Sequence, residues 1–305
     1  MHANGSPESA AAGEIRIFAN PIAGRGLGAS IAERLKTRLT TQGYRVQTFL
    51  KRASELTQDE LASPARAAIV IGGDGTLRGV AERLIEGNAI SPLLPVPLGT
   101  ANLMGKHLGI AWNPANLEEQ VCAAVDRNRV RMLDAGRANG RLFLLMTGIG
   151  FDAQIVEWLD RLRRGPIQFW DYLIPSALSL RDFPAASLRV ELDGREVFPL
   201  APALAFVGNL REYGTGFPVT PHAKSDDGLL DLCVLPCRSH AELIQLFLSA
   251  AAGEHTRGEG VVYQRGRHVN IESPTAVAVQ VDGDPAGHTP VRIDLLPVQL
   301  PFIVP

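Results

Sequence analysis

The feature that most constrains the fold of this chain is a unit that occurs three times in its first half. Each unit has a short apolar run, a glycine-bearing turn and then a helical pattern. The runs are residues 15–19, 67–71 and 93–97, and a further strand is expected at 44–50. Apolar strands that alternate with helices indicate a parallel sheet with both faces covered. Ser30 is expected to cap the first helix.

After about Asn128 the pattern changes to short strands joined by hairpins. Asn139-Gly140 and Asp193-Gly194 are typical hairpin turns between such strands. Helical insertions are expected at 153–183 and 240–252. Other strands are expected at residues 130–138, 142–147, 188–192, 196–200, 203–207, 229–235, 268–271, 276–281 and 291–295. The second half is therefore predicted to be mostly antiparallel β.

These patterns divide the chain into a polar tail (1–13), an α/β domain (14–128) and a β-rich domain (129–305), whose last residues could pack back on the first domain. Hydrophobic residues make up 46% of the 305, which excludes a disordered chain. A net charge of -2 offers no broad basic surface for nucleic acid.

Three cysteines are too few for a disulfide framework and indicate a reducing compartment. The chain has no apolar run long enough to span a membrane, and its start does not resemble a signal peptide, so a cytoplasmic protein is expected. None of the four lysines lies in a P-loop motif, which excludes that nucleotide site.

The three glycine turns are expected to meet, because every βα turn of a parallel sheet leaves the same edge. Their backbone N–H groups and helix N-termini suit a polyphosphate ligand. Asp74 lies inside the second turn, where a carboxylate would repel a bare anion. A Mg²⁺ ion between Asp74 and the phosphates would resolve this conflict. The alternative is that Asp74 caps a helix or closes a turn.

Gly72-Gly73-Asp74-Gly75-Thr76 resembles the signature of the diacylglycerol-kinase-like lipid kinases, which NAD kinases and phosphofructokinases share more loosely. The ordered stretches that also match are Asn20-Pro21 with Gly24, residues 97–102, 148–152 and 221–231. The resemblance implies a nucleotide-binding α/β domain like that of NAD kinases and phosphofructokinases, followed by a β-sandwich-like domain. It also implies ATP with Mg²⁺ in the cleft and a lipid hydroxyl as acceptor.

The resemblance also implies site residues. The nucleotide would contact Asn20, Pro21, Gly24, Thr48, Gly72, Gly73, Asp74, Gly75, Thr76, Gly99, Thr100 and Asn102. Catalysis would use Asp74, Asp282 and Asp284, with Asp284 as the proton acceptor where the family has Glu. A hairpin turn is the alternative for 282–284.

Three positions depart from the family pattern. Many relatives carry Asn-Glu where this chain has Arg78 and Gly79, and an acidic residue where it has Leu103. Arg78 is expected either to contact phosphate or to extend from the first turn of its helix. In bacterial relatives a structural Mg²⁺ is held at the positions of Lys224, Asp227 and Leu229; an ordinary turn also explains this stretch.

Two further patterns carry weaker expectations. Cys233, Cys237 and His240 lack a fourth zinc ligand, so structural cysteines are favoured. Residues 158–183 mix arginines with aromatic side chains, which suits a membrane interface, but a helical pair packed on its own sheet is favoured.

The sequence as a whole predicts an ATP-dependent lipid kinase whose partners are ATP and a lipid alcohol, either diacylglycerol-like or sphingoid. It would be cytoplasmic, with peripheral contact at the inner membrane surface as a further possibility; the oligomeric state stays open. Two alternatives remain: an NAD-kinase-type enzyme that phosphorylates a ribose, and a nucleotide- or lipid-binding protein with impaired catalysis.

Overall fold

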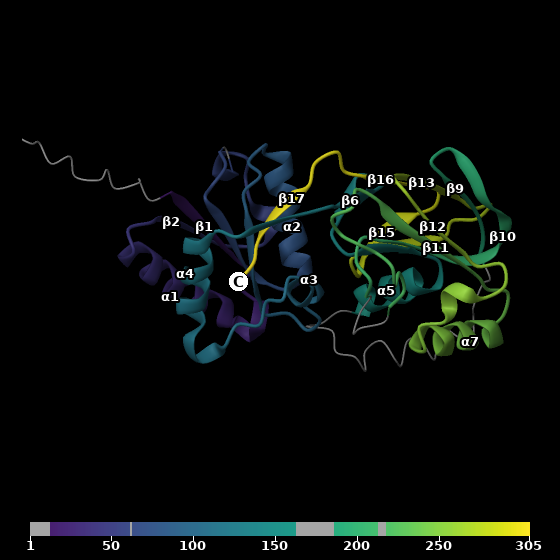
Figure 1. Ribbon diagram of the computed structural model, residues 1–305, viewed down its shortest axis with the longest axis horizontal. Coiled ribbons are helices and arrows are strands. Elements are labelled where there is room, and N and C mark those ends of the chain that lie inside the picture. The colour runs from purple at the N-terminus through teal and green to yellow at the C-terminus, as the bar shows by residue number, and fades with distance from the viewer. Residues whose placement is uncertain (1–12, 62, 163–185, 213–217) are drawn as a thin grey trace, which may run out of the picture.

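The computed structural model describes residues 13–305 apart from 62, 163–185 and 213–217. It has two lobes side by side (Figure 1). The α/β lobe contains a six-stranded sheet in the order β2-β1-β3-β4-β17-β5, and the β lobe contains an 11-stranded sheet. The predicted fold class, a parallel α/β unit followed by an antiparallel β unit, is confirmed.

The α/β lobe has a parallel core to which the end of the chain adds a strand. β1, β2, β3 and β4 run parallel, β17 pairs parallel to β4, and β5 pairs antiparallel to β17. The strands are β1 (Glu14–Ala19), β2 (Arg45–Leu50), β3 (Ala67–Gly72), β4 (Leu93–Pro97), β5 (Val130–Leu133) and β17 (Leu300–Ile303). The α-helices are α1 (Leu27–Thr41), α2 (Asp74–Glu86), α3 (Leu103–His107) and α4 (Leu117–Arg127).

The β lobe consists of antiparallel strands with two described α-helices. Its strands are β6 (Gly136–Ala138), β7 (Arg141–Phe143), β8 (Met146–Ile149), β9 (Ser187–Leu192), β10 (Arg195–Gly208), β11 (Leu230–Pro236), β12 (Val262–Gly266), β13 (His268–Glu272), β14 (Ala278–Val281), β15 (Asp284–His288) and β16 (Val291–Leu295). Both predicted hairpins form, as β6–β7 and β9–β10.

Two sequence predictions need correction. The first sheet continues past the predicted boundary at residue 128, because β5 pairs with β17 inside that sheet. The last residues do return to the α/β lobe, as β17. Ser30 does not cap the first helix: α1 begins at Leu27 after Gly26, whose left-handed backbone (φ 90) suits glycine.

The predicted helical insertions are α5 (Phe151–Leu162) and α7 (His240–Ala251). Residues 163–185 of the first insertion lie outside the described part of the chain. Ser239 caps α7 by accepting the N–H of Glu242. Within the described ranges, no helix has the length and apolar character needed to cross a membrane.

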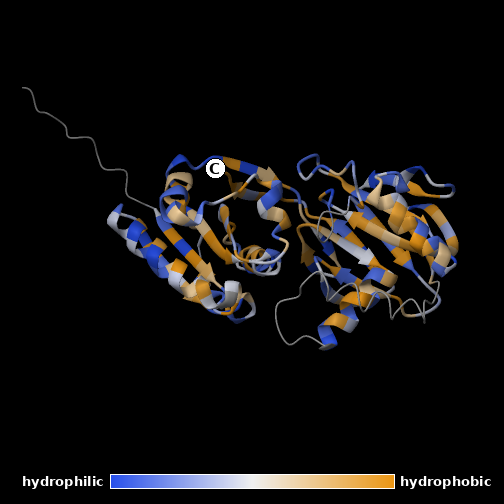
Figure 2. Cartoon of the chain, turned by 90° about the horizontal axis from the view of Figure 1, so that it is seen from below, coloured by the Kyte–Doolittle hydropathy of each residue, from blue (hydrophilic) through white to orange (hydrophobic). Residues whose placement is uncertain are grey.

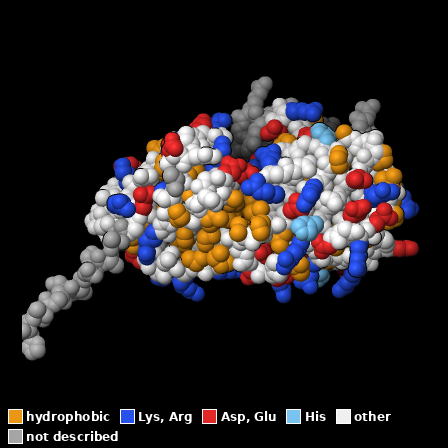
Figure 3. Space-filling view, turned by 90° about the horizontal axis from the view of Figure 1, so that it is seen from above, with side chains coloured by type: hydrophobic (Ala, Val, Ile, Leu, Met, Phe, Trp, Pro, Cys, Tyr) orange, Lys and Arg blue, Asp and Glu red, His pale blue; other side chains and the backbone are white. Residues whose placement is uncertain are grey.

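The two lobes share apolar packing. Figure 2 shows hydrophobic residues along the strands of both sheets, whereas the outer helices also carry hydrophilic ones. One buried cluster joins Leu77 of α2 and Met104 of α3 to Leu142 and Leu144 of the β lobe. From above, hydrophobic side chains also gather on the surface of the α/β lobe (Figure 3).

Asp152, at the start of α5, makes a testable contribution to stability. Its Oδ2 accepts a hydrogen bond from Gln280, whereas its buried Oδ1 has no partner within the described chain. Burial raises the pKa of Asp152 to about 7. Because the folded state therefore holds its proton more tightly, this carboxyl costs increasing stability as the pH rises from about 4 through 7.

We expect Asp152→Asn to weaken this pH dependence. Each unit of pKa shift corresponds to about 1.4 kcal/mol. Between pH 5 and pH 8, the free energy of unfolding of the wild-type protein should therefore fall by at least about 1.4 kcal/mol more than that of the variant. Urea denaturation at both pH values measures it, with the exposed Asp59→Asn as control. Parallel pH profiles for all three proteins would contradict the argument.

Candidate active site

The three glycine loops meet at the carboxyl edge of the α/β sheet. The N–H of Asn20 donates to Ile71 O (3.3 Å), and the N–H of Leu98 donates to Gly72 O (2.9 Å). These bonds join the loops that follow β1, β3 and β4. The predicted convergence of the loops is therefore present.

Close backbone contacts explain two of the glycines. A Cβ atom on Gly99 would lie 2.7 Å from the Cα of Gly73, too close for any side chain. Gly24 has a left-handed backbone (φ 57), and a Cβ there would meet Leu98 at 3.1 Å. The loops thus present backbone rather than side chains to each other, which leaves N–H groups accessible to a ligand.

Asp74 connects two of these loops. Its Oδ2 accepts the N–H of Leu103 (2.9 Å) and its Oδ1 accepts the N–H of Met104 (3.0 Å), so it satisfies donors at the start of α3. Burial raises the pKa of Asp74, although the two N–H groups and Lys106 oppose the shift. Asp74 therefore caps α3, whereas the expected cap on its own helix α2 is absent, since the N-cap there is Gly73 without a side-chain hydrogen bond. The predicted contact of Asp74 with Mg²⁺ stays a prediction.

Asp284 lies against the second glycine loop although it is more than 200 residues away in the sequence. A Cβ atom on Gly75 would be 3.9 Å from Asp284 Oδ2. The same oxygen accepts a hydrogen bond from Arg78 Nη2 (2.6 Å), and Arg78 Nη1 donates to Val281 O (2.6 Å). The expectation that Arg78 extends into solvent is therefore wrong: its buried guanidinium links α2 to the turn that carries Asp284. Its contact with phosphate stays a prediction.

Asp282 has a different environment from Asp284. Its carboxylate accepts the N–H groups of Leu144, Leu145 and Met146 at 2.8–3.0 Å. Burial raises its pKa to about 6. The three bonds fix the 282–284 turn to residues 144–146 at the start of β8, which gives Asp282 a positioning role. Its predicted part in catalysis stays a prediction.

The remaining predicted nucleotide contacts lie on or near the same loops. Asn20 Oδ1 accepts the N–H of Ile22, and Asn102 bonds to both backbone groups of Gly99, which shapes the first and third loops. Thr100 is exposed beside them. Thr48 lies in β2 and its buried Oγ1 has no hydrogen-bond partner in the described chain. Its contact with ATP stays a prediction.

The predicted second metal position has other partners. Asp227 Oδ2 forms an ion pair with Arg265 (3.1 Å), and Asp227 Oδ1 accepts the N–H of Leu229. The Lys224 ammonium in the same turn adds positive charge, which disfavours a cation. Among the described residues, no group of three or more His, Cys, Asp or Glu side chains could hold a metal. The turn interpretation of this stretch accounts for these contacts.

Cys233 and Cys237 are buried in an apolar cluster beneath α5 and α7. Burial raises the pKa of Cys237 to about 11, which disfavours the thiolate that zinc requires. This environment supports structural cysteines.

Comparisons with known proteins agree with this architecture. Residues 14–138 match the model of the diacylglycerol kinase catalytic domain, and residues 146–304 match the YegS C-terminal NAD kinase beta sandwich-like domain. The chain belongs to the diacylglycerol-kinase-like lipid kinase family. The β-sandwich-like character expected of the second half is thus also supported.

Relatives of this lipid kinase match along nearly its full length. A diacylglycerol kinase of Staphylococcus haemolyticus (strain JCSC1435) is 30% identical, with 91% of this chain and 84% of the relative covered. A diacylglycerol kinase of Mycobacterium tuberculosis (strain ATCC 25618 / H37Rv) is 29% identical, with 96% of both covered. The crystal structure of a diacylglycerol kinase from Bacillus anthracis str. Sterne has the same fold, with a TM-score of 0.69 at 23% identity; 96% of this chain and 97% of that chain are covered.

The Arg78 bridge yields a prediction for this lipid kinase. Lysine cannot reproduce the two-pronged contact with Val281 O and Asp284, so Arg78→Lys should lower kcat about tenfold or more and destabilise the fold by about 1–3 kcal/mol. Steady-state kinetics and urea denaturation measure both effects. The control is Arg83→Lys on the same helix, because this partly exposed arginine also makes a two-pronged contact, with Glu86 and Ser54 O, but does not touch Asp284. Equal behaviour of the two variants would contradict the bridging role.

Proposed function

We propose that this lipid kinase transfers the γ-phosphate of ATP to the hydroxyl of a lipid alcohol, diacylglycerol-like or sphingoid. The observation that carries the proposal is the position of the Asp284 carboxylate beside Gly75, in a glycine loop where backbone N–H groups suit phosphates. A base beside this loop is suited to accept the proton of a hydroxyl that attacks a phosphate bound there.

In this mechanism the three loops hold the triphosphate through backbone N–H groups and helix N-termini. Asp284 accepts the proton of the lipid hydroxyl as its oxygen attacks the γ-phosphorus. The bond from that phosphorus to the β,γ-bridging oxygen breaks, and ADP leaves. Arg78 and Asp282 keep Asp284 in place during this step.

The residues present fit a Mg²⁺ ion that is shared with the nucleotide. Each Asp74 oxygen accepts one N–H and keeps a further lone pair for another contact. A single carboxylate together with phosphate oxygens is a usual Mg²⁺ environment. When bound, the ion would supply positive charge against the phosphates of ATP.

The acceptor is tested directly with γ-labelled ATP. Labelled lipid should form from a panel of diacylglycerol, sphingoid bases and total lipid extract, and NAD serves as the competing acceptor. Labelled NADP with no labelled lipid would favour the NAD-kinase-type alternative. ATP binding with no transfer to any acceptor would favour the binding protein with impaired catalysis.

We further propose that the kinase works as a peripheral protein on the cytoplasmic face of a membrane, because its acceptor resides there. The exposed apolar side chains Ile244 and Leu248 of α7, and Trp158 of α5, support contact through these helices. The kinase should sediment with anionic lipid vesicles, and Leu248→Asp should weaken this association. Failure of the wild-type protein to sediment would contradict it.

A further inference from the structure

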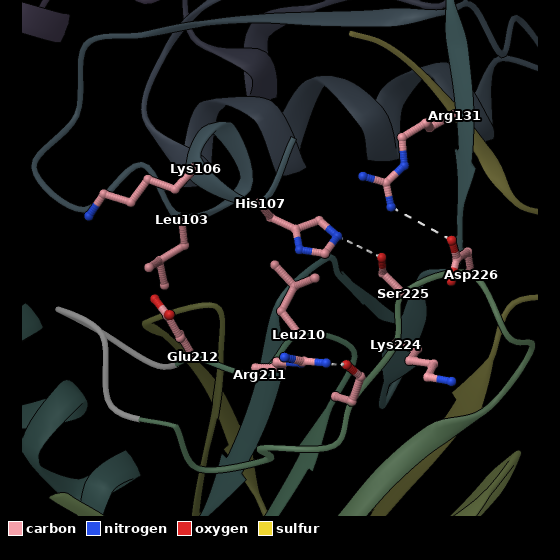
Figure 4. A pocket seen from close by; sticks show the side chains of 11 residues that line it. Leu103, Lys106, His107, Arg131, Leu210, Arg211, Glu212, Lys224, Ser225 and Asp226 are labelled. Carbon is pink, nitrogen blue, oxygen red and sulfur yellow. Dashed lines mark hydrogen bonds and ion pairs between the residues drawn. The ribbon is translucent and has the colours of Figure 1, made fainter. Parts of the chain in front are cut away.

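A polar cavity lies between the two lobes, next to the candidate active site. It has a volume of about 400 Å³ and is lined by α3, β5 and the segments around residues 210–212 and 223–226. In Figure 4, His107 on α3 faces Ser225 across the cavity, while the ammonium groups of Lys106 and Lys224 lie at its opposite edges and point outward. Its walls therefore come from both lobes.

The charge of this cavity is predominantly positive. Four of its lining side chains, Lys106, Arg131, Arg211 and Lys224, are basic, whereas Glu212 and Asp226 are acidic. Asp226 is already paired with Arg131 at 3.6 Å. Within the described part of the chain, neither lysine ammonium has a hydrogen-bond or ion-pair partner. Glu212 is the one lining carboxylate that forms no ion pair with the described residues, and basic side chains still outnumber acidic ones in the lining of the cavity.

Neutral groups add hydrogen-bonding capacity and an apolar wall. His107 Nε2 lies 2.8 Å from Ser225 Oγ. Partial burial lowers the pKa of His107, and the nearby Arg131 lowers it further, which favours the neutral ring. Leu103 and Leu210 also line the cavity and supply an apolar surface. Such a mixture suits an amphipathic ligand with one anionic group.

The cavity is continuous with the machinery proposed for transfer. Leu103 lines it and donates its N–H to Asp74. Lys106, another lining residue, is close enough to lower the pKa of Asp74. An acceptor lipid that reaches the phosphates beside Asp74 would therefore place neighbouring atoms of its head group in or near this cavity.

From this arrangement we propose that the cavity binds a phosphate-type oxyanion carried by the head group of the acceptor lipid. This inference rests on the proposed function and adds to its diacylglycerol-like and sphingoid acceptors, which carry no phosphate, a lipid alcohol whose head group bears one. A neighbouring hollow shares Arg211 and Lys224 and adds His222 and Arg265, which extends the positive surface. The leucine at position 103 contributes no negative charge that would oppose such a head group.

A matched pair of acceptors tests the proposal. Lysophosphatidic acid and monoacylglycerol of the same acyl chain share a free hydroxyl next to the acylated carbon, and the phosphate of the first replaces a second hydroxyl of the other. In mixed micelles with labelled ATP, the wild-type kinase should show at least a tenfold higher kcat/KM for the phosphate-bearing acceptor. The double variant Arg211→Gln/Lys224→Gln should lose most of this preference through a higher KM for lysophosphatidic acid. Arg238→Gln, an exposed arginine outside the cavity, serves as the control.

Calorimetry distinguishes a lipid head group from free phosphate as the bound anion. It also distinguishes failure of the anion site from failure of the proposed function. Glycerol 3-phosphate should bind the wild-type protein and bind the double variant at least tenfold more weakly, whether or not any lipid is phosphorylated. Binding of inorganic phosphate alone, with equal kcat/KM for the two lipids, would overturn the head-group assignment. Equal binding of glycerol 3-phosphate to both proteins would overturn the site itself. Absence of lipid phosphorylation with intact glycerol 3-phosphate binding would count against the proposed function and support the anion site.

Discussion

Asp284→Asn is expected to lower the rate of phosphoryl transfer by about 100-fold or more, because a general base contributes roughly 10²–10⁴-fold. The asparagine side chain has nearly the same shape and can still accept the hydrogen bond from Arg78. The turn should therefore keep its conformation, and ATP affinity should change little. Single-turnover measurements with labelled ATP and the best acceptor lipid, together with ATP titration, measure both quantities.

The matched control for this variant is Asp294→Asn. Asp294 is also a carboxylate paired with an arginine, Arg292, but it lies in β16 of the β lobe. Its replacement should leave transfer unchanged. If Asp284→Asn were as active as Asp294→Asn, the carboxylate at 284 would not be the proton acceptor, and its ion pair with Arg78 would have only a structural role.

Asp74→Ala should abolish measurable transfer and also destabilise the protein. The substitution removes the carboxylate proposed to share Mg²⁺ with the phosphates, and it leaves the N–H groups of Leu103 and Met104 without their acceptor. Loss of a helix cap costs about 1–2 kcal/mol. Transfer assays at saturating Mg²⁺ and urea denaturation separate the two effects.

Ser239→Ala provides a control with a similar structural cost. It removes the cap of α7 in the β lobe, so it should reduce stability while transfer continues. Asp74→Asn is a second comparison, because it retains an oxygen acceptor but lacks the negative charge. Near-normal turnover by Asp74→Ala would refute the assignment of the phosphate site to this loop.

The sequence was sufficient for the local elements of the α/β lobe. Apolar runs followed by glycine turns correctly located β1, β3 and β4. Asn139-Gly140 and Asp193-Gly194 correctly located one hairpin each. β12, β15 and β17 were missed. β15 contains Pro285 and Gly287, two residues that are uncommon in strands, and only its pairing with β14 defines it as one.

Part of the candidate site could also be predicted from the sequence. The meeting of the three loops follows from parallel strand order, since each βα turn leaves the same edge. The cap that Asp74 provides to α3 was harder to predict, because Leu103 and Met104 lie 29 and 30 residues after Asp74, in the next βα unit. Chain spacing contains no direct information about such a contact.

The sequence by itself determined the local elements, the glycine loops and the family to which this kinase belongs, because these depend on residues close together in the chain. Only the tertiary structure decided that Arg78 holds Asp284 and that basic side chains from both lobes line one cavity. The physical reason is that these contacts form only when the lobes pack against each other across their shared apolar cluster. That packing depends on the fit between many surfaces that are distant in the sequence, and local sequence patterns do not specify this fit.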